Sequence, residues 1–550
     1  MPEYFDLGAH PRPITTTSSD AQRWFDRGLV WTYGFNHEEA VRCFQRALDA
    51  DPGCAMAQWG IAYACGPNYN RSWDQIDPTT LATMLATAVD AVERATSMVA
   101  EASSVERALV GAIGARYQST TPAADLWAWS DAYADAMRAV YAAFPDDLDV
   151  AALFAEALIN RTPWKLWDLP TGHPAAGAST VEARAVLERA MAAPGGMTHP
   201  GVLHMYIHLM EMSPFPEKAH AAADALRGLA PDAGHLHHMP THIDMLRGDY
   251  QAVVDSNSDA IVADEKYRER EGAMNIYTLY RAHNYHFKLY GAMFLGQSEV
   301  AMEAADGMID TIPPELLRVE APPMADRLEA RMSMKLHALI RFGKWQEIID
   351  TPLPDDPKLY CVTTAMVHYA RGVAYAATGR VAEAEEEQRL FEAAVGRVPE
   401  TRVFQNNTCL DILGVAAEML AGELEYRKGN YDAAFERLSR SAARSDSLLY
   451  SEPWAWMQPP RHALGALLLE QGRVDEAAAV YRADLGLDDT LPRAHQHPEN
   501  VWALHGYHEC LVRQGRLDEA AAIRERLDAA AGRADVPVES SCYCRMTHAA

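Results

Sequence analysis

The sequence lacks the features that would place the chain in a membrane, on nucleic acid or outside the cell. No uninterrupted apolar stretch among its 550 residues reaches the length of a transmembrane helix, and the opening MPEYFDLGAHPRPITTTSSD lacks the apolar run of a signal peptide. Positive charge is in deficit, because 49 lysines and arginines stand against 76 aspartates and glutamates, which gives a net charge of −27. This balance argues against nucleic acid or an anionic membrane as partner, and a cytoplasmic location is expected.

Cysteine is scarce and dispersed, which argues against a disulfide framework in an intracellular chain of this size. The eight cysteines are Cys43, Cys54, Cys65, Cys361, Cys409, Cys510, Cys542 and Cys544. Only the last two form a close pair, in the C-terminal sequence VPVESSCYCRMTHAA, with His548 following. Two such thiols could bind Cu(I) or Zn or form a redox pair, and the alternative is a flexible tail with free thiols.

Common catalytic signatures are also missing. Runs of alternating β-branched residues are scarce, so no glycine-rich phosphate loop follows a strand, and no G-x-S-x-G nucleophile elbow occurs. The H-x-x-x-H pairs of the chain lack the His-Glu-x-x-His form of zinc proteases. The sequence therefore does not match the common nucleotide-binding, hydrolase or zinc-protease patterns.

What the sequence has in abundance is helical periodicity interrupted by short glycine turns. The segments TGRVAEAEE, KGNYDAAFE, QGRVDEAAAVY, QGRLDEAAAI, FGKWQEIID and RGDYQAVVD each place an amphipathic helix after a turn. The period is near 34 residues, which is typical of repeated helix-turn-helix units.

One of these units resembles a tetratricopeptide repeat (TPR). In residues 21–52, AQRWFDRGLVWTYGFNHEEAVRCFQRALDADP, the family's packing positions hold Trp24, Gly28, Trp31, Ala40, Phe44, Ala47 and Pro52. Further units align when Gly379, Gly429, Gly472 or Gly515 is placed in the turn. The resemblance is weak in 66–120 and 161–198, where longer loops intrude. It implies an all-α fold in which TPR-like helix-turn-helix repeats form a curved superhelical solenoid.

The expected organisation has five segments, divided by the strength of the repeat pattern. A polar N-terminal segment is followed by repeats with long loops, histidine-rich repeats, further repeats and a tail that carries the Cys-x-Cys pair. The last helix is expected to end near Ala531. The segments are 1–20, 21–198, 199–312, 313–531 and 532–550.

Histidines are concentrated in the middle of this repeat array. Seven lie between Pro200 and His242, where the chain average predicts about two. In the TPR register, eight polar side chains fall on the positions of the first helix that line the family's ligand groove. They are His204, His208, Glu211, His235, His238, His242, His283 and His286, whereas His237 is out of register.

The spacing of these residues supports the same grouping, because residues three or four apart share a helix face. Three neighbouring helices would then direct imidazoles and one carboxylate toward a common volume. Such a set suits Zn, Cu, Fe or Ni better than Mg or Ca. Because eight candidates exceed the needs of one tetrahedral ion, we expect one or two transition-metal ions, with copper ahead of zinc or iron.

A narrower resemblance accompanies this site. The strings HMYIHLME, GHLHHMPTHI and HNYHF are similar to those of a microbial TPR family of about this length, with HxxxHxxE, GHLxHMPxHI and HNxHF motifs, which indicates a shared site but names no reaction.

These patterns lead to one functional hypothesis and two alternatives. The hypothesis is a metal-dependent enzyme, an oxidoreductase acting on a small molecule. The alternatives are a TPR scaffold that binds a peptide or protein partner and a metal storage or delivery protein. Candidate substrate-pocket residues lie in the long loops and in SEPWAWMQPPRHALG: Asn68, Asn70, Trp164, Trp167, Glu452 and Arg461.

Overall fold

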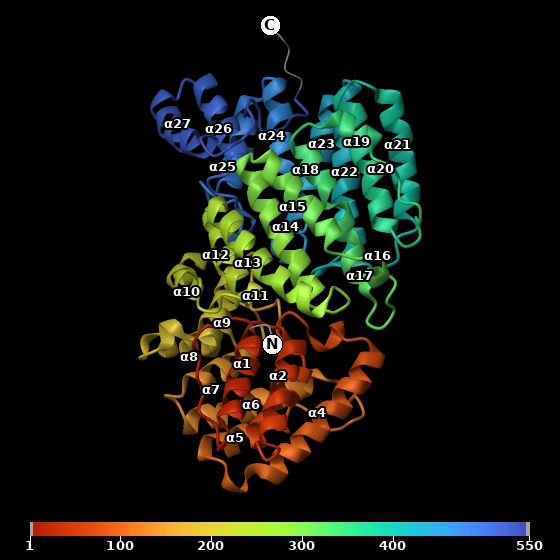
Figure 1. The fold of residues 1–550 in the computed structure, drawn as a ribbon. Coiled ribbons are helices and arrows are strands. Elements are labelled where there is room, and N and C mark those ends of the chain that lie inside the picture. The colour runs from red at the N-terminus through yellow and green to blue at the C-terminus, as the bar shows by residue number, and fades with distance from the viewer. Residues whose placement is uncertain (1–3, 546–550) are drawn as a thin grey trace. The chain divides into compact units, whose positions relative to one another are not determined.

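The computed structural model describes residues 4–545, and the regular secondary structure of this part of the chain is almost entirely helical (Figure 1). It forms two compact units. Unit 1 consists of the residues up to Ile243 together with Asp259–Gly272, and unit 2 consists of Asp244–Ser258 together with the residues from Ala273 onward. The predicted segment 199–312 therefore contributes residues to both units.

Unit 1 begins with helical hairpins and continues through shorter helices. Its α-helices are α1 (Ser19–Tyr33), α2 (His37–Ala50), α3 (Ala55–Cys65), α4 (Pro78–Met98), α5 (Ser104–Ile113), α6 (Trp127–Ala143), α7 (Leu148–Ile159), α8 (Thr180–Ala192), α9 (Pro200–Glu211), α10 (His220–Leu226) and α11 (Gly234–His238). Its 3-10 turns are η1 (Trp73–Gln75), η2 (Val99–Glu101), η3 (Gly196–Thr198) and η4 (Pro216–Ala219). Helices α12 (Pro240–Arg247) and α13 (Tyr250–Glu271) contribute to both units.

Unit 2 contains the more regular repeats. Its α-helices are α14 (Thr278–Leu295), α15 (Ser298–Asp310), α16 (Pro314–Leu317), α17 (Met324–Leu328), α18 (Met334–Arg341), α19 (Trp345–Asp350), α20 (Cys361–Ala377), α21 (Val381–Val395), α22 (Cys409–Arg427), α23 (Tyr431–Asp446), α24 (Pro460–Glu470), α25 (Val474–Asp484), α26 (Val501–Arg513) and α27 (Leu517–Ala531). Its 3-10 turns are η5 (Glu329–Ser333) and η6 (Arg493–His495). As predicted, the last helix ends at Ala531.

Within residues 4–545, strands are limited to two short antiparallel ribbons. In unit 1, β1 (Trp167–Asp168) pairs with β2 (His173–Pro174), with Trp167 opposite Pro174. In unit 2, β3 (Val403–Phe404) pairs with β4 (Asn407–Thr408), with Phe404 opposite Asn407. Each ribbon belongs to a loop between helices, so the fold is all-α, as predicted.

The predicted helix-turn-helix units are present, with glycine at the predicted turn. Helices α20 and α21 pack as one hairpin, as do α22 with α23 and α24 with α25 (Figure 1). The first helix ends in a left-handed residue, Gly379, with a φ of 77°, and Gly429, Gly472 and Gly515 repeat this geometry. Glycine is favoured there because it adopts a positive φ without a steric penalty.

Close helix packing at the predicted small position is also confirmed. A Cβ atom on Gly28 would lie 2.6 Å from the Phe44 ring, which is closer than van der Waals contact. Glycine at this position lets α1 and α2 approach until the Phe44 ring fills the space between them. The TPR-like register thus reflects side-chain packing in the first hairpin.

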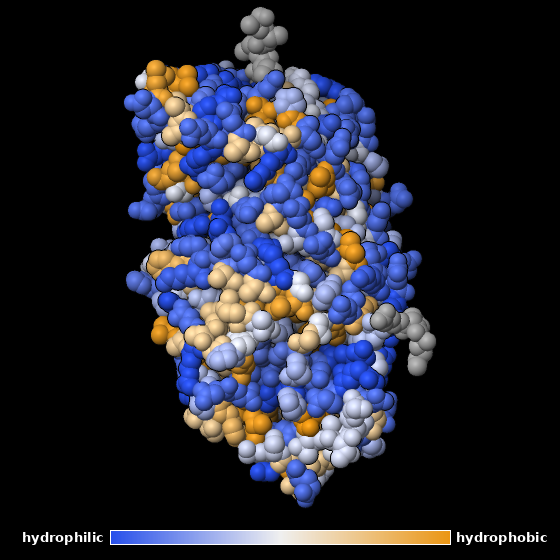
Figure 2. All heavy atoms as spheres, turned by 60° about the vertical axis from the view of Figure 1, so that its left-hand side comes forward, coloured by the Kyte–Doolittle hydropathy of each residue, from blue (hydrophilic) through white to orange (hydrophobic). Residues whose placement is uncertain are grey.

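Hydrophilic side chains cover most of the face drawn in Figure 2, and hydrophobic ones lie among them in small groups. Within residues 4–545, no helix combines the length and the apolar content that a bilayer span requires.

Candidate metal centre

Helix α9 supplies two of the predicted ligands to unit 1, and all 12 of its residues are buried. Pro200 occupies its first turn, and the Nδ1 atom of His199 caps it by accepting a hydrogen bond from the Val202 amide at 3.2 Å. A Cβ atom on Gly201 would lie 2.5 Å from the Tyr33 ring, so glycine allows α1 to approach α9 closely. This packing places His204 beside the backbone of Tyr33.

The next predicted ligands lie on two short helices instead of one continuous helix. Helix α11 ends at His238 and α12 begins at Pro240, because proline has no amide hydrogen to donate and its ring clashes with the preceding turn. The TPR register that placed His235, His238 and His242 on one first helix is therefore interrupted at Met239. His238 and His242 nevertheless remain neighbours, with ring centroids 4.8 Å apart.

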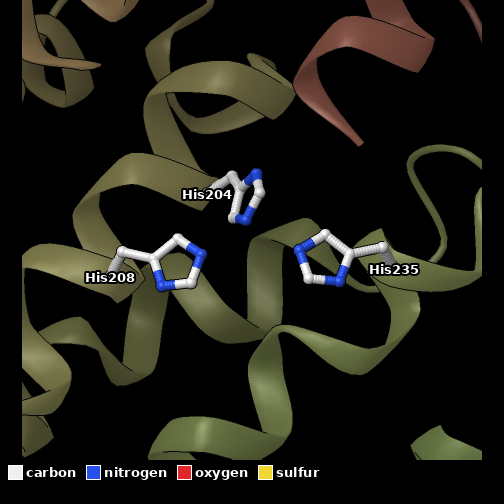
Figure 3. Close-up of side chains that lie close together, drawn as sticks. All are labelled: His204, His208 and His235. Carbon is white, nitrogen blue, oxygen red and sulfur yellow. The ribbon is translucent and has the colours of Figure 1, made fainter. Parts of the chain in front are cut away.

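Three imidazoles converge in unit 1. His204 and His208 from α9 and His235 from α11 turn their rings toward a common space (Figure 3). One ring nitrogen of each lies within 4.8 Å of the corresponding nitrogens of the other two. A tetrahedral zinc ion bound by imidazoles would hold such nitrogens about 3.3 Å apart, a separation that small side-chain rotations would reach.

Hydrogen bonds fix the orientation of two of these rings. The Nδ1–H group of His204 donates to the Tyr33 carbonyl oxygen at 2.6 Å, and Nδ1–H of His208 donates to Glu211 Oε1 at 2.9 Å. Their Nε2 atoms are buried, and neither has a hydrogen-bond partner in the part of the chain that the structure describes. A ring that donates through Nδ1 and leaves Nε2 as a lone pair is in the tautomer of many metal-ligating histidines.

Glu211 accepts from two imidazoles at once. One carboxylate oxygen accepts from His208 Nδ1, and the other accepts from His242 Nδ1 across to α12. The carboxylate is fully buried, as are both rings. In this geometry Glu211 orients the rings of two histidines. The sequence had predicted Glu211 as a metal ligand or a near neighbour of the ligands.

His242 directs its other nitrogen at His238. The two Nε2 atoms lie 2.8 Å apart. In the neutral rings, one of these nitrogens must carry a hydrogen for the contact to be favourable, whereas a bound cation would accept lone pairs from both. This pair is therefore a second group of potential ligands within unit 1.

Burial keeps the imidazoles of α9 neutral. It lowers the pKa of His204 to about 3, against the smaller opposing effect of the hydrogen bond to the Tyr33 carbonyl. Burial also holds the pKa of His208 well below its usual range, with further lowering from the nearby His204 and His238 rings. Neutral imidazole is the form that ligates a metal, so both side chains are in the binding state at neutral pH.

Aromatic side chains from unit 1 enclose this cluster. The Phe35 ring lies 4.6 Å from that of His204, and Tyr69 lies 4.7 Å from His208, measured between centroids. Trp164 meets His208 edge-on at 5.9 Å. Phe35 and Trp164 have positive φ values of 55° and 62°, a conformation that is strained for a residue with a Cβ atom.

The long loops that carry the other predicted pocket residues of unit 1 take part in different contacts. Asn68 is buried, with its amide nitrogen 3.5 Å from His37 Nε2, and its Oδ1 atom accepts from the Asn70 amide at 3.0 Å. The Trp167 indole donates to the Leu209 carbonyl near the end of α9 at 2.7 Å. Trp164 is thus the predicted loop residue that contacts a histidine of the cluster.

Two predicted ligands, His283 and His286, lie on α14 in unit 2 and remain predictions as ligands. The Nε2 atom of His286 lies 2.8 Å from the Met457 sulfur, and His283 Nδ1 lies 3.4 Å from the Gln405 side-chain nitrogen. His237, which the register left out, is half-buried and bonds to the Pro231 carbonyl at 3.0 Å.

The two pocket candidates of unit 2 are Glu452, in the loop that leads into α24, and Arg461, in the first turn of α24. Glu452 is buried, and burial raises its pKa well above the usual range for a carboxyl group. Arg461 was a candidate for binding a substrate carboxylate. Its guanidinium makes two parallel hydrogen bonds to Asp446, at 2.7 and 2.6 Å, so a carboxylate of the chain already occupies this group.

The Cys-x-Cys pair forms a disulfide in unit 2, and the other six cysteines are free thiols. The tail around it is packed, because Ser541 accepts a hydrogen bond from Arg341 and Arg545 pairs with Glu509 at 2.6 Å. One oxygen of the buried Glu423 and the two sulfurs lie within 4.8 Å of one another. His548 lies outside the described residues.

A second polar cluster in unit 1 was not predicted. Asp149 accepts from His10 and His199 at 3.1 Å each, from Tyr33 at 2.7 Å and from Arg12 at 2.8 Å. These hydrogen bonds and the adjacent positive charge outweigh the effect of burial and hold the Asp149 pKa well below its usual range. Because Asp149 already has four donors, the cluster is well satisfied as a structural network.

Sequence reasoning missed the aromatic enclosure, although one signal for it was present. Phe35 occupies the turn position that holds glycine in the later repeats, and an aromatic residue there is unexpected from packing alone. Tyr69 has no comparable signal, because it lies in a loop outside the repeat register.

No protein-family model and no curated protein matches the chain. Among solved structures it is similar to Naa15/Naa10 bound to HypK-THB, at 12% identity and a TM-score of 0.23, with 93% of this chain and 70% of that chain covered. It is also similar to the yeast Tom70, at 10% identity and a TM-score of 0.27, with 92% and 99% covered. A third similar structure is the P58(IPK) TPR domain, at 11% identity and a TM-score of 0.21, with 82% and 99% covered. At these TM-scores the likenesses carry no argument about activity or partners, and the TPR-like fold is established by the hairpins of the chain itself.

Proposed function

We propose that the chain is a metal-dependent enzyme acting on a small molecule, with a transition-metal ion bound by His204, His208 and His235. The observation that carries this proposal is the convergence of three buried ring nitrogens in unit 1. Three imidazole ligands leave a coordination position for substrate, water or O₂, which is the arrangement of catalytic sites and not of closed structural ones.

The enclosure supports chemistry more than simple storage. A buried set of imidazoles is costly to maintain unless it binds something, because each unpaired polar atom has lost its hydration. Here the cost is increased by the strained backbone of Phe35 and Trp164, whose rings contact the histidines. Strained residues that exclude water from a polar cluster are typical of functional sites.

Copper is the first choice of metal, followed by zinc and iron, and the reaction we propose is oxidoreductive. An imidazole-rich set suits all three ions. The pair formed by His238 and His242 supports a second ion, with His208 and His242 both oriented by Glu211. His283 and His286, on α14 of unit 2, remain candidate ligands.

Elemental analysis of the purified full chain tests this proposal. We expect about one or two equivalents of copper, zinc or iron, and loss of at least one equivalent in a His204→Gln/His208→Gln/His235→Gln variant that keeps the helical circular dichroism spectrum. His237→Gln serves as the matched control and should retain the metal. A wild-type chain that neither contains nor takes up any of these ions would overturn the proposal.

A partner-binding scaffold is the second candidate, and one surface feature of unit 2 favours it. Helices α23, α24 and α25 border a cleft of about 550 Å³, which is lined by apolar side chains that include Phe435, Leu464 and Val480 and by charged ones that include Arg440 and Glu476. Repeat arrays of paired helices present such surfaces to peptides. Under this function the triple histidine variant would lose metal and retain its partner.

A further inference from the structure

Arg331 is a buried cation that has no carboxylate partner in the part of the chain that the structure describes. Its side chain lies in η5 of unit 2, and the residue is only 5% exposed. The guanidinium donates to the Arg327 carbonyl at 2.6 Å and lies 5.1 Å above the Phe404 ring. Its Nε atom is buried without a hydrogen-bond partner, and no aspartate or glutamate among residues 4–545 forms an ion pair with it.

The acidic residues nearest in sequence are committed elsewhere. Glu329 accepts hydrogen bonds from the Val362 and Thr363 amides and from the Thr363 hydroxyl. Asp326 forms its ion pair with Arg402, which also approaches Glu329 at 3.8 Å. Among the described residues, a carboxylate therefore pairs with Arg402 and none pairs with Arg331.

Further unsatisfied polar groups follow along the same part of unit 2. Both ring nitrogens of the buried His337 and the indole nitrogen of Trp456 lack hydrogen-bond partners among the described residues, and the two rings meet edge-on at 4.8 Å. Elsewhere in unit 2, the Phe404 ring under the Arg331 guanidinium lies 5.2 Å from the His286 ring, and His286 Nε2 lies 2.8 Å from the Met457 sulfur.

A buried charge without a counter-ion is strongly unfavourable, so such groups are normally paired or bind an ion. One guanidinium needs one negative charge, and its planar pair of N–H groups matches the two oxygens of a carboxylate. A phosphate dianion would leave a second charge uncompensated. The Phe404 ring, which lies against the guanidinium, would suit an apolar body next to the acid group.

From this geometry we infer that unit 2 binds a small organic acid, whose carboxylate pairs with the guanidinium of Arg331. The site shares no residue with the proposed metal site, because Arg331 belongs to unit 2 and His204, His208 and His235 belong to unit 1. The sequence had suggested Arg461 for a carboxylate, but that side chain is already paired with Asp446.

Isothermal titration calorimetry of the full chain with benzoate tests this inference. We expect benzoate to bind, and its neutral analogue benzamide and inorganic phosphate to bind at least tenfold more weakly. Arg331→Met should reduce benzoate affinity at least tenfold, and Arg331→Lys should reduce it less, because lysine keeps the charge but loses the planar pair of donors. The titrations are run with metal-depleted and metal-loaded protein, so that a failure of this site is distinguished from a failure of the metal site.

Arg341 provides the matched control. It is buried to a similar extent and lies 4.8 Å above the Trp502 ring, but it has partners in the Ser541 carbonyl and His462 Nδ1. Arg341→Met should lower the melting temperature and retain benzoate binding. Arg331→Met should raise the melting temperature of the ligand-free protein, because it removes an uncompensated buried charge. Absence of benzoate binding to the wild type, equal binding to Arg331→Met, or binding of phosphate alone would overturn the inference.

Discussion

The ring of Phe35 stacks on the imidazole of His208, with the two planes 15° apart and the centroids separated by 5.9 Å. Phe35 holds this position from a left-handed turn residue, the place that Gly379 and its equivalents take in later hairpins. The left-handed conformation costs a residue with a Cβ atom about 1–2 kcal/mol. The turn of the first hairpin is therefore less stable than a glycine turn would be, and its Phe35 ring packs against the histidines.

We predict that Phe35→Gly is more stable than Phe35→Ala by about 1 kcal/mol, because both lose the ring but only glycine relaxes the turn. Denaturant unfolding of the two variants measures this difference. Gly379→Ala is the matched change in a hairpin away from the cluster, and it should cost about 1 kcal/mol. Equal stabilities for the two Phe35 variants would show that the turn is not strained.

Replacing Glu211 by glutamine should weaken metal binding about 10–100-fold, because an amide cannot accept from the Nδ1–H groups of both His208 and His242. Competition with a chelator of known affinity measures the loss. Glu217→Gln, on the exposed turn η4, is the control and should bind as the wild type does. Unchanged affinity in Glu211→Gln would argue against an orienting role.

His337 should make the protein sensitive to acid. Burial lowers its pKa to about 3, from about 6.5 in the unfolded chain, so the unfolded state binds more protons between these values. The stability from its neutral form is therefore present above pH 6.5 and lost as the pH falls toward 3. We expect His337→Phe to show a shallower fall in unfolding free energy across this window, by up to about 1.4 kcal/mol per pH unit. Equal slopes in urea unfolding of the two proteins would contradict this.

The state of the Cys542–Cys544 pair can be read by counting thiols. Denatured, unreduced protein should react at six cysteines and reduced protein at eight. Since the disulfide closes a loop of only three residues, Cys542→Ser should cost about 1–2 kcal/mol of stability at most. We also expect the reduced chain to bind one further Cu(I) equivalent, which the double serine variant would lose. Eight reactive thiols before reduction would show that the disulfide does not form.

The fold could be predicted because TPR packing leaves a regular trace in sequence. Gly28 and Gly379 mark close packing and a left-handed turn, and each role excludes most other residue types. The grouping of His204, His208 and His235 followed from the same register. The interruption of the helix at Pro240 could have been predicted, since proline ends a helix. The histidine spacing on the two sides of Pro240 nevertheless matches a continuous helix.

Other features depend on contacts between distant segments and leave no local pattern. The position of Tyr69 against His208 joins a loop to a helix more than a hundred residues away. The lack of a carboxylate partner for Arg331 among the described residues likewise depends on tertiary contacts. It is recognised only because Asp326 pairs with Arg402 and Glu329 accepts from Thr363. Sequence spacing predicts which residues of one helix lie on the same face. These two features depend instead on how separate elements pack against one another.

Helix α9 has no side that faces solvent, and this will shape how the protein tolerates variation. In α27 the buried residues are Ala520, Ile523 and Leu527, so permissive positions should recur between them with the period of the helix. Saturation mutagenesis that measures the cellular abundance of each variant should show no such periodicity in α9, since every residue from Pro200 to Glu211 is buried. We therefore expect substitutions to be tolerated at the exposed positions of helices such as α27 and to be rejected at nearly every position of α9.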